Sequence, residues 1–205
     1  MTIRVALTFD AEHPDRPARP GTTEALLAGL GRRGGRATFF VQGRWAEAYP
    51  ETARAIADGG HLVGHHSHYH TRMSLLTDDG IAQDLRDGAT EILAATGVDP
   101  APWFRCPFGA GADDPRVLAA IEAAGYRHVG WHVAADDWEP GRAAVDVADA
   151  VVGGVQAHGD GAVVLLHAWP SATLEAIEPI LDRLEAARME LCRVDELARV
   201  PAAVA

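Results

Sequence analysis

The feature that most constrains the fold of this chain is a regular alternation of short apolar runs with longer amphipathic stretches. The short runs have the length and composition of buried strands, and the stretches between them repeat apolar residues at helical spacing. Gly or Pro stands at most of the junctions, as at Gly34-Gly35 and Gly59-Gly60. Strands that alternate with helices in this way predict a parallel α/β architecture.

The pattern gives a definite set of expected elements. The expected strands are residues 3–9, 37–41, 61–63, 103–105, 128–133, 162–166 and 190–193. The expected helices are residues 22–33, 45–58, 79–96, 115–124, 145–158 and 173–187. No linker, repeat or low-complexity segment divides them, so residues 1–205 are expected to form a single domain.

Composition and charge narrow the classes of partner. With 18 basic and 29 acidic residues the formal net charge is 18 − 29 = −11, which argues against a nucleic-acid or anionic-membrane surface. Asp10 comes too early for a signal-peptide core, and no apolar run is long enough for a membrane span. Cys106 and Cys192 are too few for a disulfide framework. We therefore expect a cytoplasmic protein, although a chain trimmed of a secretory leader would look the same.

A dense group of histidines suggests a metal site. Five of the ten histidines fall between His61 and His70. His66 and His70 are four residues apart, so on one helical turn their imidazoles would point the same way. Two imidazoles and a carboxylate commonly hold a divalent transition metal, and three protein ligands leave a position open for catalysis. The alternative is a polar loop of solvated histidines.

Polar residues also recur at the ends of the expected strands, which is where active sites form in parallel α/β folds. The first strand ends near Asp10 and Glu12, and the third runs into the histidine group. Arg105, Asp137 and His167 follow later strands. Carboxylate, imidazole and guanidinium groups delivered to one edge in this way indicate a catalytic site.

At this point the motifs resemble a known family. In order along the chain stand Thr-Phe-Asp from residue 8, Gly-His-x-x-Gly-x-His-Ser-x-x-His from residue 60, Arg-x-Pro-Phe-Gly from residue 105, Asp-Trp from residue 137 and Leu-Leu-His from residue 165. This series resembles the polysaccharide deacetylase family, also called the NodB homology domain or carbohydrate esterase family four. The resemblance covers residues 5 to 167. It implies a distorted (β/α) barrel of seven parallel strands that removes acetyl groups from sugars with a divalent metal.

Matched position by position, the resemblance implies roles for individual residues. They are a catalytic base (Asp10), an arginine that orients it (Arg105), two metal ligands (His66 and His70), a catalytic acid (His167) and a carboxylate that tunes it (Asp137). These roles suit amide hydrolysis, which needs a polarised carbonyl, a deprotonated water and a proton for the departing amine. An aspartate beside a histidine would favour the imidazolium form of the acid.

The chain departs from the family pattern at the third metal ligand. Where a second aspartate usually follows the base, this chain has Ala11, which cannot ligate a metal. Glu12 comes next, and positions i and i+2 of an extended strand share a face, so Asp10 and Glu12 can converge. We therefore expect Glu12 as the third ligand, with His13 or a water as the alternative.

Aromatic and remaining histidine residues receive simpler interpretations. Phe108, Trp138 and Trp169 follow strand ends and could form the apolar floor under a sugar ring. Trp131, by contrast, is expected in the core, and Cys106 is expected to pack rather than react. The other histidines are expected to be structural (His61), solvated or supporting (His65 and His68), or surface and satisfied polar residues (His128, His132 and His158).

Three functions remain open from the sequence. The first is metal-dependent removal of acetyl groups from an N-acetylated carbohydrate, either chitooligosaccharide or peptidoglycan-like. The second is hydrolysis of a non-sugar C–N bond, in an amide or ureide, or of a formamido sugar. The third is a non-catalytic barrel that binds sugar or metal. The expected cofactor is one divalent ion, zinc first, with cobalt and nickel compatible with the same ligands. The sequence does not indicate an oligomeric state.

Overall fold

The structure is a computed structural model that describes residues 3–13 and 18–202. Its strands form one parallel sheet in the order β5-β4-β3-β2-β1-β7-β6, and β8 pairs with the first part of β1. The strand bounds are β1 Ile3–Ala11, β2 Thr38–Val41, β3 Leu62–His65, β4 Trp103–Phe104, β5 Arg127–His128, β6 Val133–Ala134, β7 Ala162–His167 and β8 Met189–Leu191. The predicted parallel α/β fold is confirmed.

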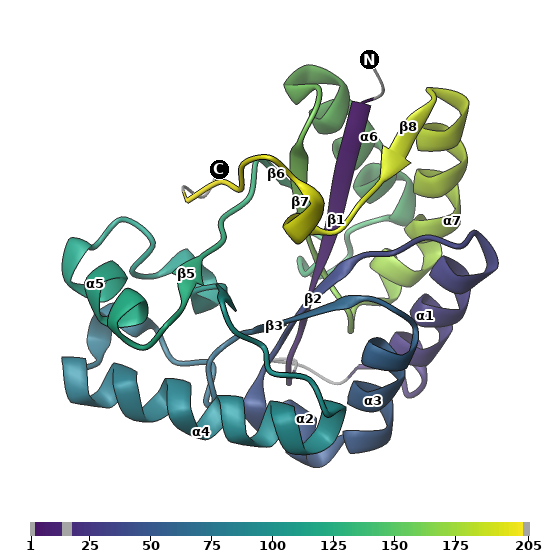
Figure 1. Cartoon of the computed structure of the whole chain (residues 1–205). Coiled ribbons are helices and arrows are strands. Elements are labelled where there is room, and N and C mark those ends of the chain that lie inside the picture. The colour runs from purple at the N-terminus through teal and green to yellow at the C-terminus, as the bar shows by residue number, and fades with distance from the viewer. Residues whose placement is uncertain (1–2, 14–17, 203–205) are drawn as a thin grey trace.

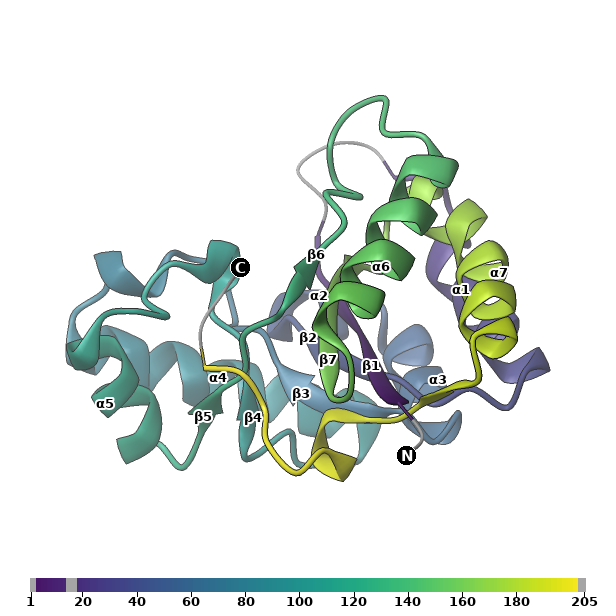
Figure 2. The same ribbon diagram turned by 90° about the horizontal axis from the view of Figure 1, so that it is seen from above.

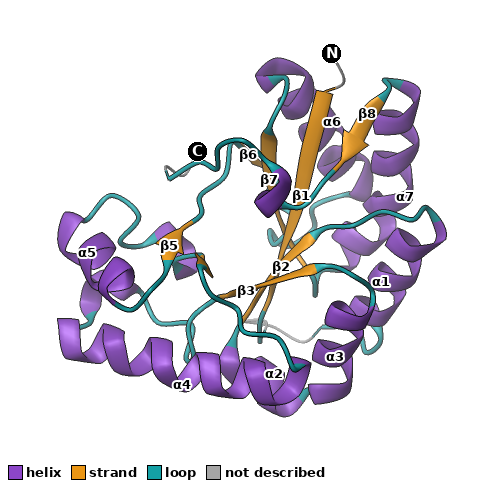
Figure 3. Ribbon diagram, in the orientation of Figure 1, coloured by secondary structure: helices purple, strands orange, loops and turns teal. Residues whose placement is uncertain are grey.

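Helices cover the outer side of this curled sheet, as Figures 1 and 3 show. Their bounds are α1 Thr22–Arg32, α2 Gly43–Ala48, α3 Pro50–Asp58, α4 Asp78–Thr96, α5 Pro115–Ala123, α6 Ala144–His158 and α7 Ser171–Ala186. Seen from above in Figure 2, α6, α7 and α1 lie near β1, β6 and β7, and α4 and α5 lie near the opposite end of the curled sheet, beside β3, β4 and β5. No helix in the described part of the chain is long and apolar enough to cross a membrane.

The expected strand 128–133 is wrong as a single element, because the structure has β5 and β6 instead. Between them the backbone carbonyls of Val129 and Gly130 accept hydrogen bonds from the Arg105 guanidinium, at 3.2 Å each. The Gly130 amide donates to Pro201 O. These backbone groups bind a buried cation and the C-terminal segment rather than a neighbouring strand, so the sheet curls into a distorted, open barrel.

The expected helix 45–58 is also divided, into α2 and α3. The break falls at Tyr49, which has φ −130° and ψ 56° and precedes Pro50. A proline ring disfavours helical backbone at the residue before it and lacks the N–H that would continue the helix, but it suits the first turn of a new one. The proline therefore ends one helix and begins the next.

The alternating faces of β1 separate the core from the site. Its outward-facing residues are buried in a hydrophobic cluster with residues of the covering helices, such as Leu26 and Ile177. These outward-facing residues are Val5, Leu7, Phe9 and Ala11. Its inward residues begin with Ala6, which packs in a second cluster with Cys192 and Val194 of the C-terminal segment. That segment fills one end of the barrel, and the later inward residues of β1 reach the other end.

Candidate active site

At the carboxyl ends of the strands, three residues form a candidate metal-binding group. One ligand atom each from Glu12, His66 and His70 lies within 4.8 Å of the other two. Glu12 Oε2 is 3.3 Å from His66 Nε2 and 2.5 Å from His70 Nε2. Glu12 and His66 are buried, and His70 is mostly so. The structure thus brings together the three ligands expected from the sequence.

The orientation of Glu12 suits a cation. Its Oε2 atom is buried and has no hydrogen-bond partner among the described residues, although two imidazole nitrogens lie close to it. Its other oxygen, Oε1, accepts a hydrogen bond from Trp169 Nε1 at 3.3 Å. A buried carboxylate oxygen without a hydrogen-bond donor is costly unless something positive lies beside it. Two imidazoles and this carboxylate are a donor set that divalent transition metals accept.

Hydrogen bonding fixes which nitrogen of His66 is available to a metal. Its Nδ1 lies 2.9 Å from the backbone oxygen of Arg105, which can only accept a hydrogen bond. Nδ1 therefore carries a proton, and Nε2, which faces Glu12, is the nitrogen that a metal can use. Metal-ligating histidines commonly have such a carbonyl partner, which sets both the tautomer and the ring orientation.

The expectation that His66 and His70 lie on one helical turn is wrong. They lie in an irregular turn after β3, and Ser67 and His70 have φ of 61° and 57°. The imidazoles still converge, with ring centroids 5.0 Å apart. Ser67 bonds locally, because its Oγ accepts from the His70 amide at 2.7 Å.

Asp10 lies beside this group and is held by Arg105. The Arg105 guanidinium donates to Asp10 Oδ1 at 2.9 Å, and Asp10 Oδ2 is 3.4 Å from His66 Nε2. Arg105 is entirely buried, and its guanidinium also lies over the rings of Phe40 and Trp131. The arginine expected to orient the base is therefore in contact with it.

His167 reaches the same group from β7. The parallel register places it opposite Asp10 on the neighbouring strand, and its Nε2 is 3.9 Å from Glu12 Oε1. Its Nδ1 lies 2.9 Å from Asp137 Oδ1, and its backbone amide donates to Asp137 Oδ2 at 2.7 Å. The hydroxyl of Thr173 donates to the same Asp137 oxygen. Asp137 thus fixes both the backbone and the ring of His167.

Electrostatics distinguish these groups. Burial works against the imidazolium of His167, but the charge and hydrogen bond of Asp137 outweigh it and raise the pKa to about 9. Burial alone would raise the pKa of Glu12, yet the imidazoles of His66 and His70 beside its carboxylate hold the pKa well below its usual range. Glu12 is therefore an anion and His167 a proton carrier near neutral pH.

A cavity of about 510 Å³, a size common for small-ligand sites, is lined by Asp10, Glu12, His66, His70 and His167. The three aromatic residues expected at the substrate all line it: Phe108 is 59% exposed, Trp138 is half-buried and Trp169 is buried. The cavity is also lined by Gln42, Tyr69 and Trp131, which we did not expect there. Tyr69 directly precedes His70 and Gln42 directly follows β2, but no pattern at either position shows that its side chain faces the cavity.

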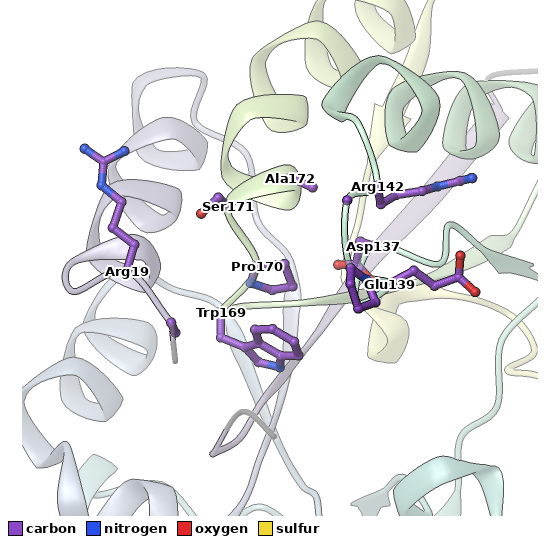
Figure 4. Close-up of a pocket in the computed structure, with 11 residues that line it drawn as sticks. Arg19, Asp137, Glu139, Arg142, Trp169, Pro170, Ser171 and Ala172 are labelled. Carbon is purple, nitrogen blue, oxygen red and sulfur yellow. The ribbon is translucent and has the colours of Figure 1, made fainter. Parts of the chain in front are cut away.

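A smaller cavity of about 210 Å³ adjoins the first. Figure 4 shows it beside Trp169, Pro170 and Ser171, with Asp137 on its far side. The long side chains of Arg19 and Arg142 extend away from Trp169 (Figure 4). Only the larger cavity gathers the imidazoles and carboxylates that hydrolytic chemistry needs.

The remaining histidines and Cys106 have mainly structural surroundings. His61 is structural, as expected, because its Nδ1 accepts from the Ala37 amide. Of the two roles expected for His65 and His68, the solvated one is wrong because both are buried, and His65 has the supporting one because its Nδ1 accepts from the Ser67 amide. Cys106 is buried and desolvation raises the pKa of its thiol to about 12, which agrees with a packing role. His132 and His158 stack on each other with ring centroids 3.8 Å apart.

The surroundings of Ala11 explain why the expected third ligand is Glu12, one position later than in the usual family pattern. Its side chain is entirely buried in the hydrophobic cluster on the outer face of β1. A carboxylate at this position would enter the apolar core, whereas Glu12 follows on the inner face. His13, the alternative ligand, is exposed, and its Nε2 lies 3.2 Å from Arg44 O.

Comparison with known proteins agrees with this geometry. The polysaccharide deacetylase family model matches residues 2–129. The peptidoglycan-N-acetylmuramic acid deacetylase PdaA of Bacillus subtilis is 28% identical over 195 residues, which cover 94% of this chain and 70% of that protein.

Two solved structures are also similar. A family 4 carbohydrate esterase from Streptomyces lividans in complex with acetate is 31% identical with a TM-score of 0.79, covering 93% of this chain and 91% of that one. A CE4 family pseudoenzyme from Bacillus anthracis is 26% identical with a TM-score of 0.84, covering 96% of this chain and 65% of that one. With the family model matching more than half of its residues, and with the motifs gathered in one cavity, the chain belongs to the polysaccharide deacetylase family.

Proposed function

We propose that this chain is a metal-dependent hydrolase that removes the acetyl group from an N-acetylated sugar of a chitooligosaccharide or a peptidoglycan-like strand. The observation that carries the proposal is the convergence of three groups in one cavity. They are the candidate metal ligands, an aspartate paired with a buried arginine, and a histidine paired with a buried aspartate. Together they match the needs of amide hydrolysis.

The residues that would hold the metal are Glu12, His66 and His70. The unpartnered Glu12 oxygen and the fixed tautomer of His66 both suit a cation. A divalent ion bound there supplies Lewis acidity that polarises the acyl oxygen and lowers the pKa of water. Zinc is the first candidate for two imidazoles and one carboxylate, and cobalt and nickel accept the same ligands.

The remaining residues divide the proton transfers. Asp10, oriented by Arg105, takes a proton from the attacking water. His167 is protonated near neutral pH because Asp137 stabilises its imidazolium, and it gives that proton to the departing amine. The acetyl C–N bond breaks, and acetate and a free amino sugar result.

The choice of substrate rests on the cavity and on the relatives. PdaA is a peptidoglycan-N-acetylmuramic acid deacetylase, and the peptidoglycan-N-acetylglucosamine deacetylase PgdA of Listeria monocytogenes is 27% identical over 194 residues. Those 194 residues cover 38% of PgdA. The exposed rings of Phe108 and Tyr69 at the cavity could contact sugar rings on either side of the acetamido group.

The non-catalytic alternative has one specific observation in its favour. The Bacillus anthracis structure of the same fold is a pseudoenzyme, and a mutant of it has restored enzymatic activity. Turnover is therefore the property to test first. In this chain the base, its arginine, the acid and its aspartate all lie in contact with one another or with the candidate ligands, which supports a working enzyme.

The test is hydrolysis by the zinc-loaded chain, followed as acetate release from chitooligosaccharides, peptidoglycan fragments and acetylated xylan. The competing classes are followed as ammonia or amine release from simple amides and ureides and as formate release from formamido sugars. We expect acetate from an N-acetylated glycan and release slowed by about 10²–10⁴-fold from the same substrate with the Asp10→Asn variant. Hydrolysis of non-sugar C–N bonds alone would instead support the second candidate function, a hydrolase of amides or ureides. A folded, zinc-loaded protein without turnover on any member would support the non-catalytic barrel.

A further inference from the structure

The turn that carries both histidine ligands is built in an unusual way. It runs from His65 to His70, contains no helix or sheet after its first residue, and has positive φ at Ser67 and His70. Residues other than glycine rarely adopt such backbone, and they keep it only where the surroundings determine it. Something outside the turn must therefore hold it.

Each backbone amide of the turn has an identified acceptor. The His66 amide continues the sheet by donating to Val41 O. The next four amides bind side chains: Ser67 N donates to His65 Nδ1, His68 N and Tyr69 N donate to the two oxygens of Asp84, and His70 N donates to Ser67 Oγ. Side-chain acceptors thus take the place of the backbone carbonyls that would accept from these amides in a strand or helix.

Asp84 is the side-chain acceptor that lies furthest from the turn in sequence. It is on α4, its side chain is buried, and it accepts from His68 N at 2.9 Å and from Tyr69 N at 3.2 Å. It touches neither candidate ligand directly. Because two consecutive amides are bonded to one carboxylate, the backbone between His66 and His70 is held in one conformation.

Close packing of α4 against the turn strengthens this arrangement. A Cβ at Gly88 of α4 would lie 2.6 Å from His65 Nε2 and 3.2 Å from His68 N. A Cβ at Gly43 would lie 2.6 Å from both Gly88 Cα and His68 Nδ1. His65 Nε2 also lies 3.0 Å from Leu85 O of α4. The helix approaches the turn as closely as backbone allows, so the Asp84 carboxylate sits at a fixed distance from it.

We propose that Asp84 is a positioning residue for the metal site, because its buried carboxylate clamps the His68 and Tyr69 amides and thereby sets the separation of His66 and His70. This role rests on the proposed function, since it presumes that the two histidines bind a metal. Asp84 acts through the backbone and does not contact the reacting groups.

The test compares zinc affinity in the full chain, its Asp84→Ala variant and its Asp84→Asn variant, by competition with a chromophoric chelator. The asparagine keeps one acceptor oxygen and places an N–H₂ against the second amide. It is the smaller change, so zinc affinity can still be measured on this variant if the alanine variant fails to fold. Loss of a group that orients metal ligands typically weakens metal binding by about 10–100-fold. We expect a loss of that order for alanine and a smaller one for asparagine.

A second measurement separates positioning from general stability. The visible absorption of the cobalt-loaded proteins reports the arrangement of ligands, and we expect an altered spectrum in both Asp84 variants. The matched control is Asp87→Asn, which removes the same charge from the same helix at a residue bonded to Gln83. This control should keep wild-type zinc affinity and the wild-type cobalt spectrum.

The outcomes distinguish the two levels of the proposal. Wild-type zinc affinity and an unchanged cobalt spectrum in both folded Asp84 variants would overturn the role of Asp84, even if their melting temperatures fell. Absence of zinc binding by the wild type, with His70→Ala as its reference, would instead overturn the metal site itself and with it any role in positioning it.

Discussion

Asp10 and His167 stand opposite each other on the adjacent strands β1 and β7, yet their surroundings are built differently. Asp10 is paired with Arg105, which is entirely buried and bonded to two backbone carbonyls inside the barrel. His167 keeps 12% of its side chain exposed, and Trp138 lies beside it at the cavity. The proposed base is thus fixed in the interior, and the proposed acid lies where a leaving group can reach it. The proposed transfer of a proton from water therefore uses a rigidly held carboxylate. The proposed transfer of a proton to the leaving group uses a histidine that the substrate can reach.

The largest expected effects come from removing each proton carrier. Asp10→Asn and His167→Ala should each lower kcat by about 10²–10⁴-fold, the usual contribution of a general acid or base. Neither should empty the metal site, because neither is in the ligand set. Steady-state kinetics on the best N-acetylated substrate, with metal content measured in parallel, check both statements. Wild-type kcat in the His167→Ala variant would remove the acid from the mechanism and leave the fold assignment intact.

The two partners should differ in their effect on stability. Arg105→Met leaves the Asp10 carboxylate buried beside the site without its cation, and breaking a buried ion pair in this way costs about 3–5 kcal/mol. Asp137→Asn keeps an oxygen that can accept from His167 Nδ1 and leaves no uncompensated buried charge, although its N–H₂ faces the His167 amide, so its cost should be smaller. Chemical denaturation of the metal-free proteins measures both free energies of unfolding. Equal losses in the two variants would contradict the contrast between a pair that is buried throughout and a pair whose histidine is partly exposed.

The pH profile should respond to Asp137. Activity requires protonated His167 and therefore falls as pH rises through the pKa of this group, which Asp137 raises to about 9 against the effect of burial. Asp137→Asn removes the negative charge, so the pKa falls and the basic limb of kcat/KM moves to lower pH. A bound cation lowers the pKa in both proteins, so both are compared with the same metal. A basic limb at the same pH in wild type and variant would argue against His167 as the acid.

The smallest expected effect is at the cavity rim. Phe108 is 59% exposed, and its ring lies 4.4 Å from the His70 ring. Phe108→Ala should raise KM by a few-fold, about 0.5–1.5 kcal/mol for loss of an aromatic contact, with little change in kcat. Val145→Ala, an equally exposed apolar residue on α6, is the control and should leave KM unchanged. A fall in kcat with constant KM would assign Phe108 to the chemistry rather than to sugar contact.

Sequence reasoning succeeded where a local rule decides the geometry. Alternation along a strand is local, so Asp10 and Glu12 were correctly placed on one inner face and Ala11 on the other. The order of strands and helices followed in the same way from periodicity. These features need no knowledge of distant contacts.

It failed where a distant group decides the backbone. The turn of His66 and His70 is irregular because its amides bind Asp84 and neighbouring side chains, and nothing in the spacing of the two histidines shows this. The expected strand 128–133 divides because Arg105 binds its carbonyls. His65 is buried because α4 packs on it at Gly88. In each case tertiary contacts override a local pattern.

The most direct measurement of the central proposal is the metal content of the purified chain after dialysis against zinc, beside His66→Ala, His70→Ala and the double variant. We expect one zinc per wild-type chain and none in the double variant, with Glu12→Ala greatly weakened. The same loss should remove deacetylation of the best substrate, and added zinc should restore it only in the wild type. Full zinc occupancy in the double variant, or acetate release by metal-stripped wild type, would contradict a catalytic metal held by Glu12, His66 and His70.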